Sequence, residues 1–249
     1  KAVNYSSLGT IEFLVDKKHN KDVGKFSLSL MDNILLLCDD LFSLKYKHGG
    51  YEEFSISDPK PRIIHKASVR DRLVHHAIYR SLFLYFEKVF IADSYSCRIN
   101  KGPYKAIDRF KYFFYKVSKN NHKTCWILKC DIKKFFASID HEILISILNK
   151  KILDKNIMWL LKKVISSFHS TRIGIGLPLG NLTSQLFANI YMNELDQFIK
   201  YDLKLKYYIR YADDFVILSE DKKRLEDKLL KIKEFLKNKL KLELHPNKV

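Results

Sequence analysis

The sequence contains few of the residues that crosslink or interrupt a chain. Its 249 residues include four cysteines, five prolines and eight glycines. Because none of the cysteines forms a C-x-x-C pair, neither a zinc ribbon nor a thioredoxin-like motif is indicated. We interpret Cys125 and Cys130 as small core residues flanking the apolar segment 126–128, which we expect to be a buried strand. This cysteine usage fits a reduced, cytoplasmic setting.

Long apolar runs are also absent. No segment approaches the roughly 18 consecutive apolar residues that indicate a transmembrane helix. The segment from Lys1 to Thr10 lacks the apolar core of a signal peptide. We therefore expect no membrane partner. The chain does not begin with methionine, and residues 241–249 read as the middle of an element, so we expect a fragment of a longer protein.

Acidic residues are outnumbered by basic ones. Asp plus Glu number 28 against 45 Lys plus Arg, which gives a net charge of +17 at pH 7. The excess is spread over both halves, with 21 basic and 13 acidic residues in 1–122 and 24 and 15 in 123–249. Such a chain usually binds a polyanion, which is nucleic acid, an acidic membrane surface or an acidic protein. A hydrophobic content of 47% supplies a sizeable core and excludes intrinsic disorder.

The length of 249 residues fits one ordinary domain or two small ones, and hydrophobic periodicity predicts a mixture of helices and strands. Patterns typical of helices cover 28–44, 68–90, 106–117, 141–150, 155–168, 182–200 and 222–239. Short extended or apolar segments at 62–64, 124–130, 206–211, 215–219 and 240–244 predict strands. Strands 206–211 and 215–219 flank a tight turn, so we expect a β-hairpin with Asp213 and Asp214 at its tip.

Three acids are expected to meet at strand ends. Asp213 and Asp214 lie at the hairpin tip, and Asp131 ends the strand 124–130. Gathered carboxylates repel one another unless a cation neutralises them, and hard divalent ions such as Mg²⁺ take oxygen ligands. Two such ions about 3.5–4 Å apart clamp the attacking and leaving oxygens of phosphoryl transfer. The alternative is ordinary turn chemistry and surface ion pairing, since Asp is common in turns.

The order of three short segments adds context to these acids. Residues 130–136 (CDIKKFF), 176–181 (GLPLGN) and 211–214 (YADD) resemble motifs A, B and C of reverse transcriptases. The similarity continues upstream through 60–64, 69–72 and 93–98, and downstream through 242–248, which looks like motif D. The resemblance covers roughly residues 50–249, and residues 1–50 carry no motif that we can place.

This resemblance implies an α+β right-hand polymerase fold, with fingers plus a palm that holds an antiparallel sheet. The thumb is expected to be absent or truncated, because the chain stops soon after motif D. Fingers are expected in 1–100, of which 1–50 stay unplaced, and palm with motif A in 101–141. Residues 142–180 are expected to return to the fingers and form the motif B loop, and 181–249 to complete the palm.

The resemblance also implies a reaction, RNA-directed DNA synthesis, and residues that perform it. Asp131 and Asp213 would bind two Mg²⁺ ions, with Mn²⁺ as a substitute, while Asp214 completes the set and the Ile132 carbonyl contributes a ligand. Partners would be template RNA, a DNA or RNA primer and dNTPs.

Further residues are assigned by the same resemblance. The expected dNTP contacts are Lys60 and Arg62 on the triphosphate, Phe136 as steric gate, Leu179 at the nascent pair, and Lys248 as proton donor to pyrophosphate. The expected nucleic-acid contacts are Arg98, Lys101 and Gln185. For each there is a plainer alternative: a packed aromatic or aliphatic side chain, or a solvated basic one.

Motif B favours one branch of the family. Most reverse transcriptases carry Gln before the motif B glycine and Ser-Pro further on, whereas this chain has Leu179 and then Ser184-Gln185. This pattern looks like diversity-generating retroelements, whose enzymes copy template RNA with frequent errors opposite adenine and act beside a small basic accessory protein. Because Leu cannot form a side-chain hydrogen bond, Leu179 is expected to lower fidelity. The alternatives are a group II intron or phage-defence reverse transcriptase, and a non-catalytic nucleic-acid-binding protein on a polymerase scaffold.

Overall fold

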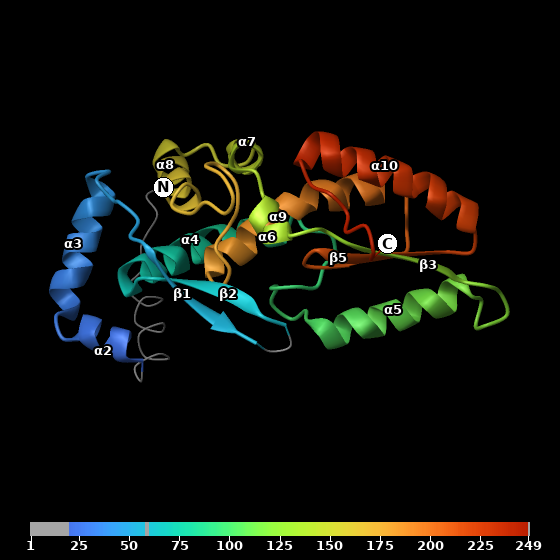
Figure 1. Ribbon diagram of the computed structural model, residues 1–249, viewed down its shortest axis with the longest axis horizontal. Coiled ribbons are helices and arrows are strands. Elements are labelled where there is room, and N and C mark those ends of the chain that lie inside the picture. The colour runs from blue at the N-terminus through green and yellow to red at the C-terminus, as the bar shows by residue number, and fades with distance from the viewer. Residues whose placement is uncertain (1–19, 58–59, 249) are drawn as a thin grey trace. The chain divides into compact units, whose positions relative to one another are not determined.

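The computed structural model describes residues 20–57 and 60–248 (Figure 1). The expectation for Lys1 to Thr10 lies outside the described residues. The chain folds as two compact units. Unit 1 comprises residues up to Tyr85 together with Ile145–Leu186, and unit 2 comprises Phe86–Leu144 and Phe187–Val249. No helix of the described residues is long and apolar enough to cross a bilayer.

Unit 1 is mainly helical, with one small sheet. Its elements are α2 (Lys21–Ser27), α3 (Leu30–Phe42), β1 (Tyr51–Ile56), β2 (Arg62–Ala67), α4 (Val69–Glu87, all but its last two residues), the last turns of α7 (His141–Asn149), α8 (Lys155–Ile165) and the start of α9 (Leu182–Gln197). β1 and β2 pair antiparallel, with Ser55 opposite Ile63. The sequence had not predicted β1, because its YEEFSI segment is almost wholly exposed and shows no alternation of buried and exposed positions.

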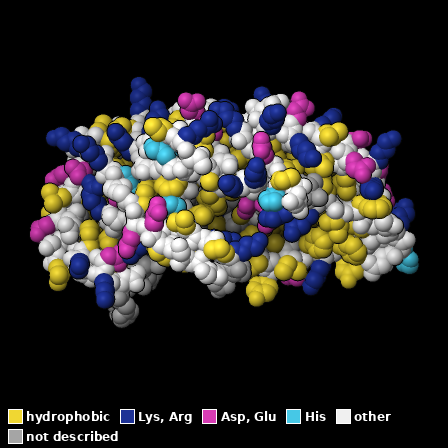
Figure 2. Space-filling model, viewed as in Figure 1, with side chains coloured by type: hydrophobic (Ala, Val, Ile, Leu, Met, Phe, Trp, Pro, Cys, Tyr) yellow, Lys and Arg dark blue, Asp and Glu magenta, His cyan; other side chains and the backbone are white. Residues whose placement is uncertain are grey.

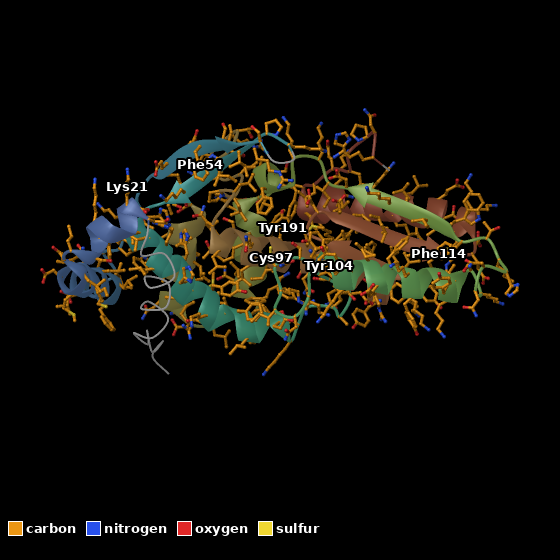
Figure 3. The ribbon with its side chains drawn as sticks, turned by 90° about the horizontal axis from the view of Figure 1, so that it is seen from below. Lys21, Phe54, Cys97, Tyr104, Phe114 and Tyr191 are labelled. Atoms are coloured by element: carbon orange, nitrogen blue, oxygen red, sulfur yellow. The ribbon has the colours of Figure 1, made fainter. Side chains whose placement is uncertain are left out.

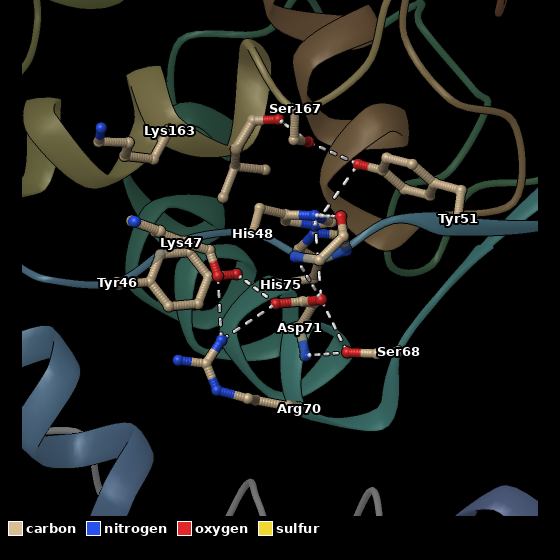
Figure 4. A network of polar contacts seen from close by, with 12 residues as sticks. Tyr46, Lys47, His48, Tyr51, Ser68, Arg70, Asp71, His75, Lys163 and Ser167 are labelled. Atoms are coloured by element: carbon tan, nitrogen blue, oxygen red, sulfur yellow. Dashed lines mark hydrogen bonds and ion pairs between the residues drawn. The ribbon is translucent and has the colours of Figure 1, made fainter.

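A buried polar network forms part of the interior of unit 1 (Figure 4). The Asp71 carboxylate accepts hydrogen bonds from the Tyr46 hydroxyl at 2.7 Å, the Gly49 amide at 3.0 Å and the Ser68 hydroxyl at 2.7 Å. The Asp71 amide in turn bonds to Ser68, as expected for the start of a capped helix. Beside it, the Nε2 atoms of His48 and His75 lie 3.0 Å apart. Burial lowers the pKa of His75 to about 3, so this imidazole is neutral.

Unit 2 is built on a three-stranded antiparallel sheet. Its strands are β3 (Trp126–Asp131), β4 (Tyr208–Tyr211) and β5 (Asp214–Ser219), in the order β3-β5-β4. Its helices are α5 (Pro103–Val117), α6 (Phe135–Ser138), the first turn of α7, most of α9, the π-helical turn η1 (Phe198–Asp202) and α10 (Lys222–Leu240). The antiparallel sheet with α5 and α10 on opposite sides confirms the expected α+β class (Figure 1).

The α5 side of the sheet holds a defined core. Phe113 and Val117 of α5 pack against Ile209 and Leu218 of the strands, and all four are buried. Figure 3 is seen from this side, with Tyr104 at the beginning of α5 and Phe114 near its end. Successive residues of β5 point to opposite faces of the sheet. Phe215 and Ile217, which lie on the face opposite to that of Leu218, are also buried. The hairpin is therefore anchored on both sides.

Two sequence expectations in unit 2 need correction. The segment 126–128 was expected to be buried, but Trp126 is 41% and Ile127 45% exposed. Cys130 is buried as expected and Cys125 half-buried. Residues 240–244 form no strand: α10 continues to Leu240, and only one bridge, Ile132 with Leu244, follows. Lys241 at the helix end has a φ of +49°, which turns the chain before it can extend.

Candidate active site

The sheet register brings the three acids to one edge. Asp131, the last residue of β3, lies directly opposite Asp214, the first residue of β5. Asp213 precedes it in the turn that joins β4 to β5, where Ala212 has a φ of +54°. Asp131 is buried, Asp213 half-buried and Asp214 exposed. The register thus places the backbone positions of the three acids at one edge of the sheet within unit 2.

The electrostatics of Asp213 show that the three carboxylates interact. Burial is the main cause that raises the pKa of Asp213 above its ordinary value, and the negative charges of Asp214 and Asp131 raise it further. A hydrogen bond to its own backbone amide and the Lys248 ammonium lower this pKa, yet the net shift is upward. The acidic edge is therefore short of positive charge, and a bound cation would stabilise it.

Lys248 contacts this edge directly. Its ammonium forms an ion pair with the carboxylate of Asp131, and this bond raises the pKa of Lys248. The backbone places it there: the His245 amide donates to the Asp131 carbonyl at 2.7 Å, and the Lys248 amide donates to the His245 carbonyl at 3.2 Å. The segment that looks like motif D thus lies against the segment that looks like motif A.

The same pairing orients the carbonyl of Ile132. The bridge between Ile132 and Leu244 uses the amide of Lys133 and the carbonyl of Asp131. In this antiparallel arrangement, the amide and carbonyl of the bridged residue itself face away from its partner. The Ile132 carbonyl therefore faces away from residues 243–245, and its contact with a metal stays a prediction.

A buried ion pair stabilises the turn between β4 and β5 that contains Asp213. Arg210 of β4 donates from Nε and Nη2 to the Asp196 carboxylate, and from Nη1 to the Ala212 carbonyl at 3.0 Å. Arg210 Nη1 also donates to the Asn189 side-chain oxygen. The Tyr208 hydroxyl donates to the Asp196 carboxylate. Sequence reasoning missed this support, although a charged residue in the middle of the apolar strand 208–211 was a usable signal.

Comparison with known proteins identifies the family. The family described as "Reverse transcriptase (RNA-dependent DNA polymerase)" matches residues 53–249, which include the acidic edge and the segment around Lys248. The chain belongs to the reverse transcriptase family. The expectation drawn from motifs A to D is confirmed at this level.

Relatives and solved structures agree with this assignment. This reverse transcriptase chain is 30% identical over 184 residues to the group II intron-encoded protein LtrA of Lactococcus lactis subsp. cremoris, covering 70% of the chain and 29% of LtrA. It is 30% identical over 165 residues to an uncharacterized 91 kDa protein in cob intron of Schizosaccharomyces pombe, covering 60% and 20%. The apo telomerase of Candida tropicalis, truncated from its C-terminal domain, has a similar fold, with a TM-score of 0.57, 12% identity and coverage of 80% and 49%. The chain thus spans under a third of these two curated relatives.

Two of the expected nucleic-acid contacts have internal roles in this reverse transcriptase chain. The Arg98 side chain is 4% exposed and is bonded to the Glu87 carboxylate and to the carbonyls of Ile91 and Ser94. Lys101 donates to the Ala92 carbonyl at 2.7 Å. The Arg98 guanidinium is therefore already held by protein acceptors, and its contact with the template stays a prediction.

Phe136 is the last residue of the segment that resembles motif A, and it lies in α6. Lys134 precedes it with a φ of +47°, and this turn directs the chain into the short helix. Phe135 is buried, whereas Phe136 is half-buried and contacts Phe135 edge to face at 5.3 Å. Of the two rings, Phe136 keeps accessible surface, so its role as a steric gate stays a prediction.

The other expected contacts belong to unit 1. Lys60 and Arg62 are exposed at the start of β2. The half-buried Leu179 follows the motif B prolyl residue, and its carbonyl accepts from the His65 amide of β2 at 2.9 Å. Gln185 lies in the first turn of α9 and is half-buried. The structure thus brings the motif B loop and β2 together through main-chain atoms.

The loop fits closely against β2. The Asn181 side-chain amide donates to the His65 carbonyl at 2.7 Å. Gly180 has a φ of +97°, and a Cβ there would lie 2.5 Å from Ile64 Cγ2. Only glycine combines this backbone conformation with such close packing.

The part of the chain that the structure describes contains no ready-made metal cage. Within residues 20–57 and 60–248, no three His, Cys, Asp or Glu side chains converge as a metal-binding group. The chemistry of the acidic edge nevertheless fits a divalent cation, since its carboxylates repel one another and already attract the Lys248 ammonium.

Proposed function

We propose that this chain carries the nucleotide-transfer site of an RNA-directed DNA polymerase that copies template RNA into cDNA. The observation that carries this proposal is the register that sets Asp131 opposite Asp214, with Asp213 beside them. A chain without catalytic function gains nothing from clustered acids that raise one another's pKa. Family membership supports the same conclusion.

Divalent ions would be held by the acidic edge. Asp131 and Asp213 would contact both, with Asp214 and the Ile132 carbonyl as further ligands, and Mg²⁺ or Mn²⁺ would suit these oxygens. When bound, such ions activate a primer 3′-hydroxyl and offset charge on the leaving pyrophosphate. The raised pKa of Asp213 and the ion pair of Asp131 with Lys248 show that this edge attracts positive charge.

Residues of the chain itself would bind the dNTP and protonate the leaving pyrophosphate. Lys248, like any exposed lysine, carries its proton at neutral pH, and its contact with Asp131 raises its pKa further; it would give that proton to pyrophosphate. Arg62 and Lys60 would bind the triphosphate, and Arg62 would do so with two parallel hydrogen bonds. The half-buried ring of Phe136 would exclude a 2′-hydroxyl.

Template RNA, a primer and dNTPs would be the partners. Lys and Arg side chains are distributed over the whole face shown in Figure 2, which suits a long polyanion better than a small acidic ligand. Gln185 and exposed lysines would contribute to this binding. Such a reaction belongs in the cytoplasm, where template RNA and dNTPs are found.

Two branches of the family remain as candidates for the biological role. Leu179 and Ser184-Gln185 favour a diversity-generating retroelement, with an error-prone reaction and a small basic accessory protein. The similarity to LtrA favours a group II intron role. A template repeat encoded near the gene would decide for the first branch.

Primer extension tests the activity. With Mg²⁺ and an RNA template, we expect synthesis that falls about a hundredfold or more in Asp213→Asn. Asp227→Asn, which removes an exposed acid of α10, is the matched control and should retain activity. Equal, metal-independent signal in Asp213→Asn and the parent chain would refute catalysis. Mn²⁺ binding, followed by electron paramagnetic resonance, should be lost in Asp131→Asn and retained in Asp227→Asn.

A further inference from the structure

A surface cavity of about 400 Å³ lies in unit 1, between the end of α7 and α8. Residues lining it include Asn149, Leu153, Lys155, Met158, Trp159 and Lys162. The acids of the proposed active site belong to unit 2, and none of the cavity residues has a role in the proposed reaction. The cavity therefore needs an account of its own.

One face of α8 supplies the chemical character of the cavity. Lys155, Trp159 and Lys162 are separated by four and three residues, so they lie along one side of the helix. The two lysines are about 10 Å apart along the helix axis, at 1.5 Å per residue. The opposite side, with Leu161 and Val164, is buried in the core. The buried side of α8 thus holds the helix in place, while its other side presents Lys155, Trp159 and Lys162 in a row.

These groups are not committed to other contacts. Within the part of the chain that the structure describes, no ring stacks on Trp159, and neither Lys155 nor Lys162 forms an ion pair. Asp154, the nearest acid in sequence, is engaged as the N-cap and accepts the amides of Asn156 and Ile157. Residues 149–165 hold five lysines and this one aspartate. The local field is therefore positive.

The lining matches one ligand class. A half-buried indole beside Met158 and Leu153 offers an apolar, aromatic surface, and the two ammonium groups and the Asn149 amide offer contacts to anions and polar edges. Nucleobases stack on aromatic side chains without regard to sequence, and lysines bind the flanking phosphates. An acidic peptide would satisfy the lysines but would leave the indole without a stacking partner.

We propose that this cavity binds a nucleotide unit, with its base stacked on Trp159 and its phosphates on Lys155 and Lys162. Single-stranded RNA or DNA and a free nucleotide share this chemistry. The row of two lysines, with more lysines nearby, favours a strand with several phosphates. The inference does not depend on polymerase activity, because it concerns unit 1 alone and its test contains neither dNTP nor divalent metal.

Intrinsic fluorescence can report on this cavity alone. The chain has two tryptophans, and Trp126→Phe leaves Trp159 as the only one. We expect octauridylate to quench Trp159 to saturation, and uridine monophosphate to quench it more weakly. Lys155→Gln with Lys162→Gln should weaken octauridylate binding at least tenfold. This double variant should also reduce the slope of log affinity against log salt by about 1.4, at about 0.7 per single-strand phosphate contact. Lys163→Gln, which removes a neighbouring charge outside the cavity lining, should change neither.

Three further arms decide the remaining alternatives. Quenching by uridine monophosphate as tight as by octauridylate would assign the cavity to free nucleotides and keep the base-stacking chemistry. Polyglutamate that quenches Trp159 as well as octauridylate does would overturn the proposal, because it has no base to stack. With a fluorescein-labelled octauridylate, anisotropy should show about tenfold weaker binding for Trp159→Leu and near-parental binding for Trp159→Phe. Equal affinity of all these variants, with unchanged circular dichroism, would also overturn it.

Discussion

Arg210 donates from Nε and Nη2 to the two carboxylate oxygens of Asp196, at 2.8 and 2.7 Å, and neither side chain is more than 1% exposed. The same guanidinium reaches the Ala212 carbonyl, one residue before Asp213. A charge pair enclosed in protein therefore fixes the backbone conformation of the acidic turn. Removing one partner leaves the other as an uncompensated buried charge.

Loss of Arg210 should be costly to stability. Arg210→Met should lower the free energy of unfolding by about 3–5 kcal/mol, because Asp196 stays buried without its partner. Urea denaturation followed by circular dichroism measures this. Arg224→Met on the exposed face of α10 should change stability by less than about 0.5 kcal/mol. The double variant Arg210→Met with Asp196→Leu should recover part of the loss. A loss under 1 kcal/mol in the single variant would contradict the assigned role.

Asp213 should destabilise the metal-free fold at neutral pH. Its folded pKa lies above the ordinary value of 3.8, chiefly through burial, so the folded state binds the proton more tightly than the unfolded chain does. Unfolding free energy from this group therefore falls as pH rises through that window. In EDTA at pH 7, Asp213→Asn should melt at a higher temperature than the parent chain, and this difference should shrink as pH falls toward 3.8.

Metal addition supplies the converse measurement. Scanning calorimetry with millimolar Mg²⁺ should raise the melting temperature of the parent chain by mass action and leave Asp213→Asn almost unchanged. An Asp213→Asn variant that melts below the parent in EDTA at pH 7 would show that the carboxylate of Asp213 is stabilised by a partner other than a metal ion.

His75 should make unit 1 sensitive to acid. Its pKa is lowered to about 3 by burial, whereas an unfolded histidine titrates near 6.5, so the unfolded chain takes up a proton first as pH falls. Stability should decline from about pH 6.5 downward, by at most about 1.4 kcal/mol per pH unit from this group. His75→Gln should flatten that decline in urea titrations, while His122→Gln at an exposed site should not. Identical slopes for the parent and His75→Gln would contradict a neutral, buried imidazole.

Leu179 should influence copying accuracy. We propose that residue 179 lies at the nascent base pair; Leu179→Gln introduces a side chain that can hydrogen-bond there, so misincorporation opposite template adenine should fall by about tenfold. Leu179→Met keeps the site apolar and should leave the error rate unchanged. Sequencing of cDNA made on an adenine-rich RNA template measures both. Equal error rates for Leu179→Gln and the parent chain would remove Leu179 from the explanation of fidelity.

The sequence predicted those features of the fold and the site that depend on a local pattern of residues. Asp131, Asp213 and Asp214 could be placed together because Asp131 ends one apolar strand and the other two acids lie in and beside the turn between two more, and strand ends in a small sheet meet at its edges. The long helices α4 and α10 were foreseen for a similar reason, since their apolar positions recur at helical spacing. The spacing of apolar residues along the chain therefore predicts both the strand ends and the long helices.

Partnerships across the chain could not be foreseen in the same way. Arg98 was interpreted as a template contact because nothing in the sequence indicates that Glu87, eleven residues earlier, encloses it. The Arg210–Asp196 pair joins β4 to α9 and becomes visible only once the strand is packed on the helix. Segment 240–244 was read as a strand because its alternation is real, but the left-handed turn at Lys241 leaves it a single bridge.

The attachment of the motif B loop to β2 separates the anchoring of the loop from the identity of the side chain at position 179, two properties that usually change together. Its hydrogen bond from His65 ends on the main-chain carbonyl of residue 179, so it exists whichever side chain that residue carries. Natural selection can therefore exchange the side chain at this position while the anchoring of the loop stays the same. If Leu179 has the role that we propose for it, copying accuracy would change with the side chain at this position while the hydrogen bond that anchors the loop is retained.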